Sequence, residues 1–245
     1  SSGYLGQHFK KFYNEAGWRV ITLGRHEEND IFWDGSLKRN ISKSDFKHSI
    51  DRIVHCAAVN ETMINKSPEL TFDVNVTFTR TLCSLAIALD IREFIYISTF
   101  HVYGISSGSI QPNMKCNPIN DYGLTHYLSE EILRNSFRDT NIATLCLRPT
   151  NIYGLPVNIS TFNRWSLVPF SFVKEAMEEN CIKLLSDGTQ VRNFVDVQND
   201  YSPEEGGFGF PDPLGHPAHL ETVGSGAASS SVAAAAAGTA CGGAT

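Results

Sequence analysis

Two glycines near the start of the chain, Gly3 and Gly6, stand where a turn leads directly into an amphipathic segment. Backbone N–H groups at such a helix entrance carry partial positive charge and bind phosphate oxygens. The opening S-S-G-Y-L-G is therefore predicted to be the second half of a glycine-rich dinucleotide turn that binds a pyrophosphate. The alternative is that both glycines serve an ordinary turn.

A second candidate group is Arg25, which lies in the sequence T-L-G-R-H at the end of a strand-like run. An acidic residue at this place binds the adenosine ribose 2′-hydroxyl of NAD, whereas an arginine accommodates the 2′-phosphate of NADP. Because the run holds no acidic residue, NADP is predicted in preference to NAD. The alternative is an exposed arginine at a strand end that binds no ligand.

These groups need elements to position them, and the hydrophobic pattern predicts alternating strands and helices. Helical spacing covers residues 7–16, 68–89 and 122–137, and the strand-like runs are 19–23, 52–58, 93–98 and 143–148. Strands separated by helices form a parallel sheet with right-handed crossovers. The predicted fold class is thus α/β, a doubly wound, Rossmann-like parallel sheet that binds ligands at the carboxyl ends of its strands.

The charge, hydropathy and cysteine content of the chain argue against several classes of function. The 245 residues carry 20 Lys and Arg against 26 Asp and Glu, a net charge of -6, which argues against nucleic acid and against a polybasic membrane surface. No apolar run reaches the roughly 18–20 residues of a membrane span, and no secretory signal is seen, so no membrane association and a cytoplasmic location are predicted. The six cysteines form no C-x-x-C pair, so no metal module is predicted and the thiols are expected to be reduced.

The two ends of the chain differ from its body. The first glycine of the dinucleotide turn and the strand before it would precede residue 1, so the sheet is expected to lack its first strand. At the other end, residues 202–245 are rich in Gly, Ala, Ser and Pro and have little to bury, which predicts a disordered tail. A linker and a frameshifted or foreign C-terminus are both compatible with that composition.

Five motifs follow one another along the body. They are D-R-I-V-H-C-A-A at 51–58, Asn75-Val76, Ser98-Thr99-x-x-Val102-Tyr103-Gly104, Tyr122-x-x-x-His126, and Leu147-Arg148-Pro149-x-Asn151-x-Tyr153-Gly154. In order and spacing they resemble the extended short-chain dehydrogenase/reductases, specifically the nucleotide-sugar epimerase/dehydratase family. The resemblance covers roughly residues 3–200. It implies a cofactor, NADP or NAD, and a nucleotide-sugar substrate.

The resemblance also implies the catalytic residues. Family enzymes transfer a hydride between a sugar carbon and the nicotinamide, and a tyrosine takes the hydroxyl proton; Tyr122 occupies that position. An unperturbed tyrosine has a pKa of ~10, and the family supplies a lysine one helical turn later to lower it. Here that position holds His126, which departs from the pattern and puts full activity in question. The alternative is a Tyr and a His on a solvent face.

Further roles follow from the same resemblance. Thr99 matches the residue that hydrogen-bonds the reacting sugar oxygen, and Phe100-His101 replaces the Asp-Glu pair of the 4,6-dehydratases, which disfavours dehydration. Asn75 matches a residue that braces the strands. The residues implied to contact the cofactor are Gly3, Gly6, Arg25, Ala57, Ala58, Ser98, Tyr122, His126 and Pro149, and those implied to contact the substrate are Asn151 and Arg192.

The predicted organisation is a Rossmann-like domain over 1–160, the start of an incomplete substrate domain over 161–201, and the tail. The leading functional hypothesis is an NAD(P)-dependent epimerase or oxidoreductase that acts on a nucleotide sugar. An NADP-dependent ketosugar reductase and a non-catalytic dinucleotide-binding fragment remain as alternatives. Family members commonly form homodimers through two helices, for which the helices at 68–89 and 122–137 are the candidates.

Overall fold

The computed structural model describes residues 2–33, 41–59, 61–64, 66–105, 107–184, 186–189 and 191–197. The predicted tail, 202–245, lies outside the described residues. The two interpretations of its composition, a linker and a foreign C-terminus, therefore both stay predictions. The chain divides into two compact units, Ser1–Thr150 and Asn151–Thr245. The first domain expected from the sequence, 1–160, ends beyond Thr150, the last residue of the first unit.

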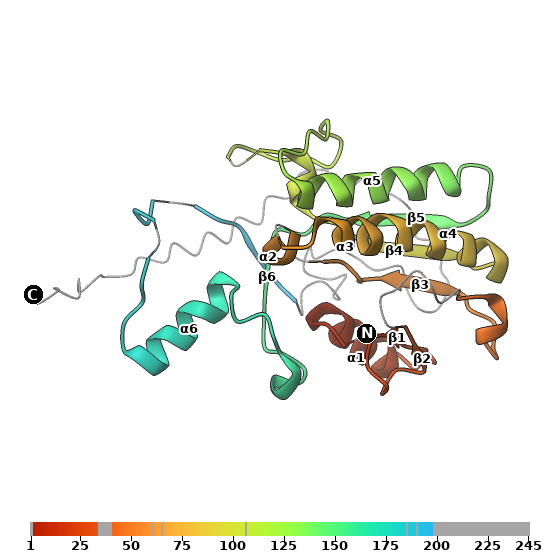
Figure 1. Ribbon diagram of the computed structural model, residues 1–245, viewed down its shortest axis with the longest axis horizontal. Coiled ribbons are helices and arrows are strands. Elements are labelled where there is room, and N and C mark those ends of the chain that lie inside the picture. The colour runs from red at the N-terminus through yellow and green to blue at the C-terminus, as the bar shows by residue number, and fades with distance from the viewer. Residues whose placement is uncertain are drawn as a thin grey trace, which may run out of the picture. The chain divides into compact units, whose positions relative to one another are not determined.

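Three parallel strands form the main sheet of the first unit (Figure 1): β3 (Arg52–His55), β4 (Glu93–Ile97) and β5 (Ala143–Leu147), in the order β3-β4-β5. The register places His55 beside Tyr96 and Tyr96 beside Cys146. In the central strand β4, every residue from Phe94 to Ile97 is buried, as expected for a strand covered on both faces. The α/β arrangement with parallel strands predicted from the apolar runs is confirmed.

The strand expected at 19–23 is wrong over most of its length. Only Leu23–Gly24 forms β1, which pairs in parallel with β2 (Ile31–Phe32). One residue earlier, the backbone N–H of Thr22 donates to a carboxylate oxygen of Asp30 at 2.8 Å. A side chain thus takes the place of a strand partner, which apolar patterning cannot foresee.

The helices of the first unit are α1 (Tyr4–Glu15), α2 (Glu61–Ile64), α3 (Pro68–Phe72), α4 (Phe78–Leu89) and α5 (Asp121–Ser136). Those predicted at 7–16 and 122–137 are confirmed with shifted ends. The helix predicted at 68–89 is interrupted by a π-helical turn, η2 (Asp73–Thr77), which joins α3 to α4. Such turns occur frequently at functional sites. Figure 1 shows α4 and α5 side by side over the sheet, and the two helices are in contact.

The core of this unit lies between α4, α5 and the sheet. It is built from apolar side chains of all three, together with Trp33, whose ring stacks on Phe78 at a centroid distance of 3.8 Å. Phe94 of β4 contacts Phe137, just after α5, at 5.4 Å. The alternation of β4 therefore directs Phe94 and Tyr96 toward the helices, because residues two apart share a face.

The segment Pro68–Leu89 corrects one expectation from the sequence. By length and composition it is apolar enough to cross a membrane, although no such run was expected. Its apolar residues Leu82, Cys83 and Ala86 are at most 5% exposed and belong to the core described above. Packing against the sheet accounts for the hydropathy of this segment.

The second unit has a smaller set of described elements. The strands β6 (Asn151–Tyr153) and β7 (Phe194–Asp196) pair in parallel, with Asn151 beside Phe194. Between them in the chain lie the short turn η4 (Ile159–Thr161) and the helix α6 (Val168–Glu179). Two further 3-10 turns, η1 (Lys43–Asp45) and η3 (Phe100–Tyr103), belong to the first unit.

Candidate functional site

The candidate site begins at the carboxyl end of β4. After Ile97 the chain continues as Ser98 and Thr99, both at most 5% exposed, and then enters the turn η3. The backbone N–H of Ser98 donates to the carbonyl oxygen of Leu147 at 2.7 Å, and that of Phe100 donates to Pro149 at 3.1 Å. The pairing of β4 with the β5 chain is thus prolonged, which fixes Thr99 and Pro149 at the same edge of the sheet.

Thr99 also begins the turn η3, because its side-chain oxygen accepts a hydrogen bond from the backbone N–H of His101 at 3.3 Å. The first turn of α5 packs directly on this segment. A Cβ added to Gly123 would lie 2.5 Å from the carbonyl oxygen of His101, so only glycine permits this approach. Asn120 starts α5 by accepting a hydrogen bond from the N–H of Gly123 at 2.8 Å.

The close approach brings the implied catalytic residues together. The ring of Tyr122 lies 5.4 Å from the ring of His101 and 4.8 Å from that of His126, in edge-on geometry in both pairs. Tyr122 and His126 share one face of α5 because they are four residues apart. That face points to the sheet, since His126 is only 2% exposed. The alternative of a Tyr and a His on a solvent face is therefore wrong for His126.

His126 is held by a residue that the sequence did not single out. The hydroxyl of Tyr96 on β4 lies 2.8 Å from Nδ1 of His126. Among the described residues, Nε2 of the same ring is a buried nitrogen without a hydrogen-bond partner. The period-two pattern of β4 and the four-residue spacing on α5 together were the available signal for this contact.

Burial controls the charge of the histidines at this site. Loss of hydration and, to a smaller extent, the nearby His101 lower the pKa of His126 to about 4. Burial likewise lowers the pKa of His55 to about 3, with His126 as a second cause. Burial also raises the pKa of Tyr96 above its ordinary value. At neutral pH the group that replaces the family lysine is thus a neutral imidazole.

A buried ion pair supports the same strand end. The carboxylate of Glu130, 2% exposed, accepts hydrogen bonds from Arg148 Nε at 2.9 Å and from Arg148 Nη2 at 2.5 Å. The hydroxyl of Ser98 donates to the same carboxylate at 2.5 Å. Arg148 also donates to the hydroxyl of Tyr103 at 2.8 Å. The Ser98 hydroxyl thus makes a structural contact, and the cofactor contact that the resemblance implies for it stays a prediction.

Asn75 links three elements. Its side-chain oxygen accepts a hydrogen bond from the N–H of Val59, after β3, at 2.7 Å, and its amide donates to Thr125 of α5 at 3.0 Å. The hydroxyl of Ser129 on α5 donates to the backbone carbonyl of Asn75 at 2.6 Å. The bracing role implied by the resemblance therefore agrees with the contacts that Asn75 makes.

The remaining implied cofactor contacts lie at helix and strand ends. Gly3 precedes α1 in extended backbone, and within the described part of the chain no side chain caps that helix, so its first N–H groups can bind an anion. Ala57 is half-buried and Ala58 exposed after β3. Arg25 is exposed just after β1.

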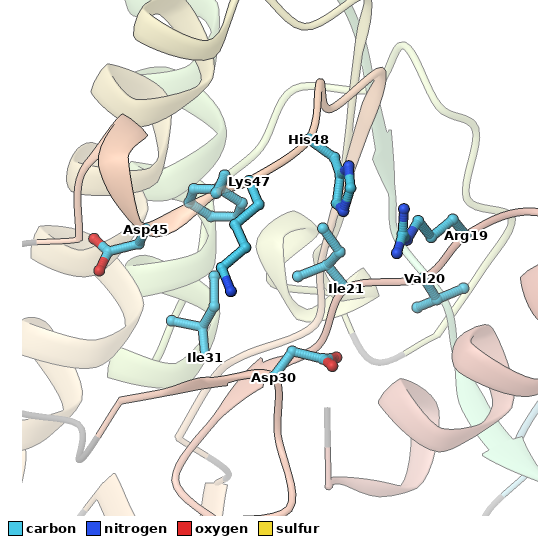
Figure 2. Close-up of a pocket in the computed structure, with 9 residues that line it drawn as sticks. Arg19, Val20, Ile21, Asp30, Ile31, Asp45, Lys47 and His48 are labelled. Carbon is cyan, nitrogen blue, oxygen red and sulfur yellow. The ribbon is translucent and has the colours of Figure 1, made fainter.

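A pocket of about 270 Å³ lies apart from these residues (Figure 2). Figure 2 shows Arg19 and Asp45 on opposite sides of it, with the Lys47 side chain between them. The carboxylate of Asp30 at its edge already accepts two hydrogen bonds from Thr22, which lower the pKa of that carboxyl. None of the implied catalytic residues lines this pocket.

The implied substrate contacts, Asn151 and Arg192, belong to the second unit. Asn151 opens β6, and its amide donates to the carbonyl oxygen of Asn193 at 2.9 Å. Arg192 is exposed one residue before that carbonyl. The β6–β7 pairing thus brings these two positions near each other, and neither belongs to the cluster within the first unit.

Most of the chain matches a known protein family. Residues 1–201 match the NAD dependent epimerase/dehydratase family. The chain belongs to the NAD-dependent epimerase/dehydratase family. Membership over this range agrees with the order of the motifs along the chain.

One curated relative is distant in sequence. An ADP-L-glycero-D-manno-heptose-6-epimerase of Cupriavidus pinatubonensis is 24% identical over 217 residues, which are 81% of this chain and 64% of that protein. The chain thus spans less than two thirds of the length of this curated relative.

Solved structures of epimerases share the fold. The UDP-glucuronic acid 4-epimerase from Bacillus cereus, in complex with UDP-glucuronic acid and NAD, superposes with a TM-score of 0.69 at 22% identity, covering 81% of this chain and 68% of that one. The UDP-glucose 4-epimerase of Thermotoga maritima with UDP-glucose gives 0.66 at 20% identity, with coverage of 81% and 68%.

The residues of this chain fit a bound dinucleotide at two points. The N-terminus of α1, which follows Gly3, suits a pyrophosphate, and Nε2 of His126, buried and without a partner among the described residues, suits a ligand hydroxyl. NAD, when bound, supplies the hydride acceptor or donor.

Proposed function

We propose that this protein is an NAD-dependent oxidoreductase of the nucleotide-sugar epimerase type, which acts by hydride transfer at a sugar hydroxyl or keto carbon. The observation that carries the proposal is the place of Thr99, Tyr122 and His126 where β4 ends and α5 begins. The ring of Tyr122 lies against that of His126 and that of His101, whose backbone N–H donates to Thr99. The resemblance assigned roles to these three positions, and the contact at Gly123 explains how the fold brings them together.

Each residue has a distinct task in that reaction. Tyr122 moves the proton between its phenolic oxygen and the reacting sugar oxygen as the hydride is transferred. The Thr99 hydroxyl donates a hydrogen bond to the same sugar oxygen. His126 contributes a neutral hydrogen-bonding group beside Tyr122, because burial holds its pKa at about 4.

A neutral His126 favours a second candidate, a ketosugar reductase. Without a cation one helical turn after it, Tyr122 lacks the neighbouring charge that would stabilise its phenolate form. A protonated Tyr122 is ready to donate its proton to a ketone, the step that accompanies hydride delivery. An epimerase recycles its cofactor, whereas a reductase consumes one NADH for each ketosugar, so cofactor consumption separates the two.

The cofactor is proposed to be NAD. The family is described as NAD-dependent, and the Bacillus cereus structure contains NAD. The preference for NADP that Arg25 predicted from the sequence remains a prediction, and its exposed side chain after β1 is the group that would have to contact a 2′-phosphate.

The first experiment is a titration of the purified chain with NADH and, separately, NADPH, followed by Trp fluorescence. Saturable binding with NADH tighter than NADPH supports the proposal, and the reverse order supports the Arg25 prediction. Absence of binding to either cofactor would refute the proposed activity.

UDP-glucose and UDP-glucuronic acid are the first substrate probes, since structures of the same fold contain them. Tyr122→Phe should retain cofactor binding and lose turnover. His126→Lys places the family's cation beside Tyr122, and a gain in turnover would show that the scaffold is catalytic. No gain in a variant that still binds cofactor would favour the non-catalytic alternative.

A further inference from the structure

A row of aromatic and imidazole rings runs between the sheet and α5. His55 on β3 and Tyr96 on β4 are register partners, and their rings lie 5.1 Å apart. The ring of Tyr96 lies 5.8 Å from that of His126, which in turn contacts Tyr122 at 4.8 Å. The row therefore runs from the interior of the sheet to the proposed proton-transfer residue.

We propose that Tyr96 is a positioning residue: its hydroxyl donates a hydrogen bond to Nδ1 of His126, which places the single ring proton on Nε2 and makes that atom a fixed donor to the bound ligand. The inference rests on the proposed function, because it deepens the role of His126 in cofactor binding.

Three features of the contact support this assignment. The Tyr96 hydroxyl lies 2.8 Å from Nδ1, within hydrogen-bond distance. Burial raises the pKa of Tyr96 and lowers that of His126, so both groups are neutral and each carries one proton. The two nitrogens lie on nearly opposite edges of an imidazole, so a ring held at Nδ1 directs Nε2 away from β4.

The state of Nε2 is the reason to expect a ligand there. In the described part of the protein this nitrogen is fully buried and has no hydrogen-bond partner. A buried polar atom without a partner is destabilising, so such atoms are rare unless they have a function. The acceptor that fits a neutral N–H donor on this face of α5, beside Tyr122, is a hydroxyl oxygen, such as that of a ribose.

The test uses Tyr96→Phe, which keeps the ring and removes only the hydroxyl. Tyr13→Phe is the matched control: Tyr13 is also buried, at 7% exposure, and its hydroxyl accepts a hydrogen bond from Arg52 at 3.2 Å, a contact that does not involve His126. The first readout is the 15N chemical shifts of the His126 ring in the full chain without cofactor. The second is the Kd for NADH.

In the unmodified protein the shifts should show a protonated Nε2 and an unprotonated Nδ1. Tyr96→Phe should give a mixture of the two tautomers and raise the Kd for NADH by the inverse of the fraction that keeps its proton on Nε2, about twofold for an equal mixture. Tyr13→Phe should change neither readout.

A proton on Nδ1 in the unmodified chain would overturn the proposal, as would an unchanged Kd in Tyr96→Phe. The ring shifts need no ligand, so they test the positioning role even if NADH fails to bind, which would refute the proposed function separately. If Tyr13→Phe alters the ring shifts as strongly as Tyr96→Phe, the effect is a general loosening and the proposal is also overturned.

Discussion

Acidification should destabilise the first unit through two histidines that the fold keeps neutral. Burial lowers the pKa of His126 to about 4 and of His55 to about 3. In the unfolded chain both return to ~6.5, so between that pH and the folded values the unfolded state binds more protons. The stability that these groups contribute is complete above pH ~6.5 and is lost as the pH falls toward about 4 and about 3.

The magnitude follows from the linkage relation. Well inside this window each histidine lowers the free energy of unfolding by about 1.4 kcal/mol for each pH unit of acidification. From pH 6.5 to pH 5 the two together should lower the free energy of unfolding by roughly 3 kcal/mol, a large part of the ~5–15 kcal/mol of a typical domain. Among the described residues, the causes of both shifts are burial and another histidine, so no carboxylate contributes a compensating term to either pKa.

The assay is urea unfolding at several pH values in this range and constant ionic strength, followed by circular dichroism and Trp fluorescence. The slope of the unfolding free energy against pH is the quantity to compare, because it is independent of the stability that a substitution removes at every pH. His126→Phe and His55→Phe should each reduce the slope by about half, and the double variant should be nearly flat. A flat profile in the unmodified chain, or an unchanged slope in both variants, would refute the reasoning.

Three further predictions concern the elements around the site. Gly123→Ala should destabilise by roughly 1–3 kcal/mol in urea unfolding and weaken NADH binding, because its Cβ would lie 2.5 Å from the His101 carbonyl oxygen; a more stable variant would contradict the packing. Arg148→Met should cost about 3–5 kcal/mol by leaving Glu130 buried and unpaired, and adding Glu130→Leu should restore most of it; an equally unstable double variant would argue against this cause. Asn75→Leu should cost about 2–3 kcal/mol by thermal or urea unfolding, since it removes two buried hydrogen bonds and leaves the N–H of Val59 unpaired; a loss below measurement would show that the bond is replaced.

The sequence by itself determined the parallel strands at the three apolar runs and the helices between them. Continuous apolar composition and helical spacing are local properties, and here they agree with burial: Phe94 to Ile97 is buried throughout, and α5 lies within one residue of the range expected. The same local reasoning was wrong at residues 19–22, where the Asp30 side chain binds the backbone of Thr22. It also missed the π-turn at Asp73–Thr77.

Both the sequence and the packing of the elements define the candidate site. The residue types and spacing indicated Thr99, Tyr122 and His126, because the order of motifs is readable along the chain. Only the tertiary structure decided that His126 is buried, neutral and bound to Tyr96, and that Ser98 is held by Glu130. The physical reason is that desolvation and side-chain hydrogen bonds depend on what packs against a residue from other elements, whereas periodicity records only which face of its own element it occupies.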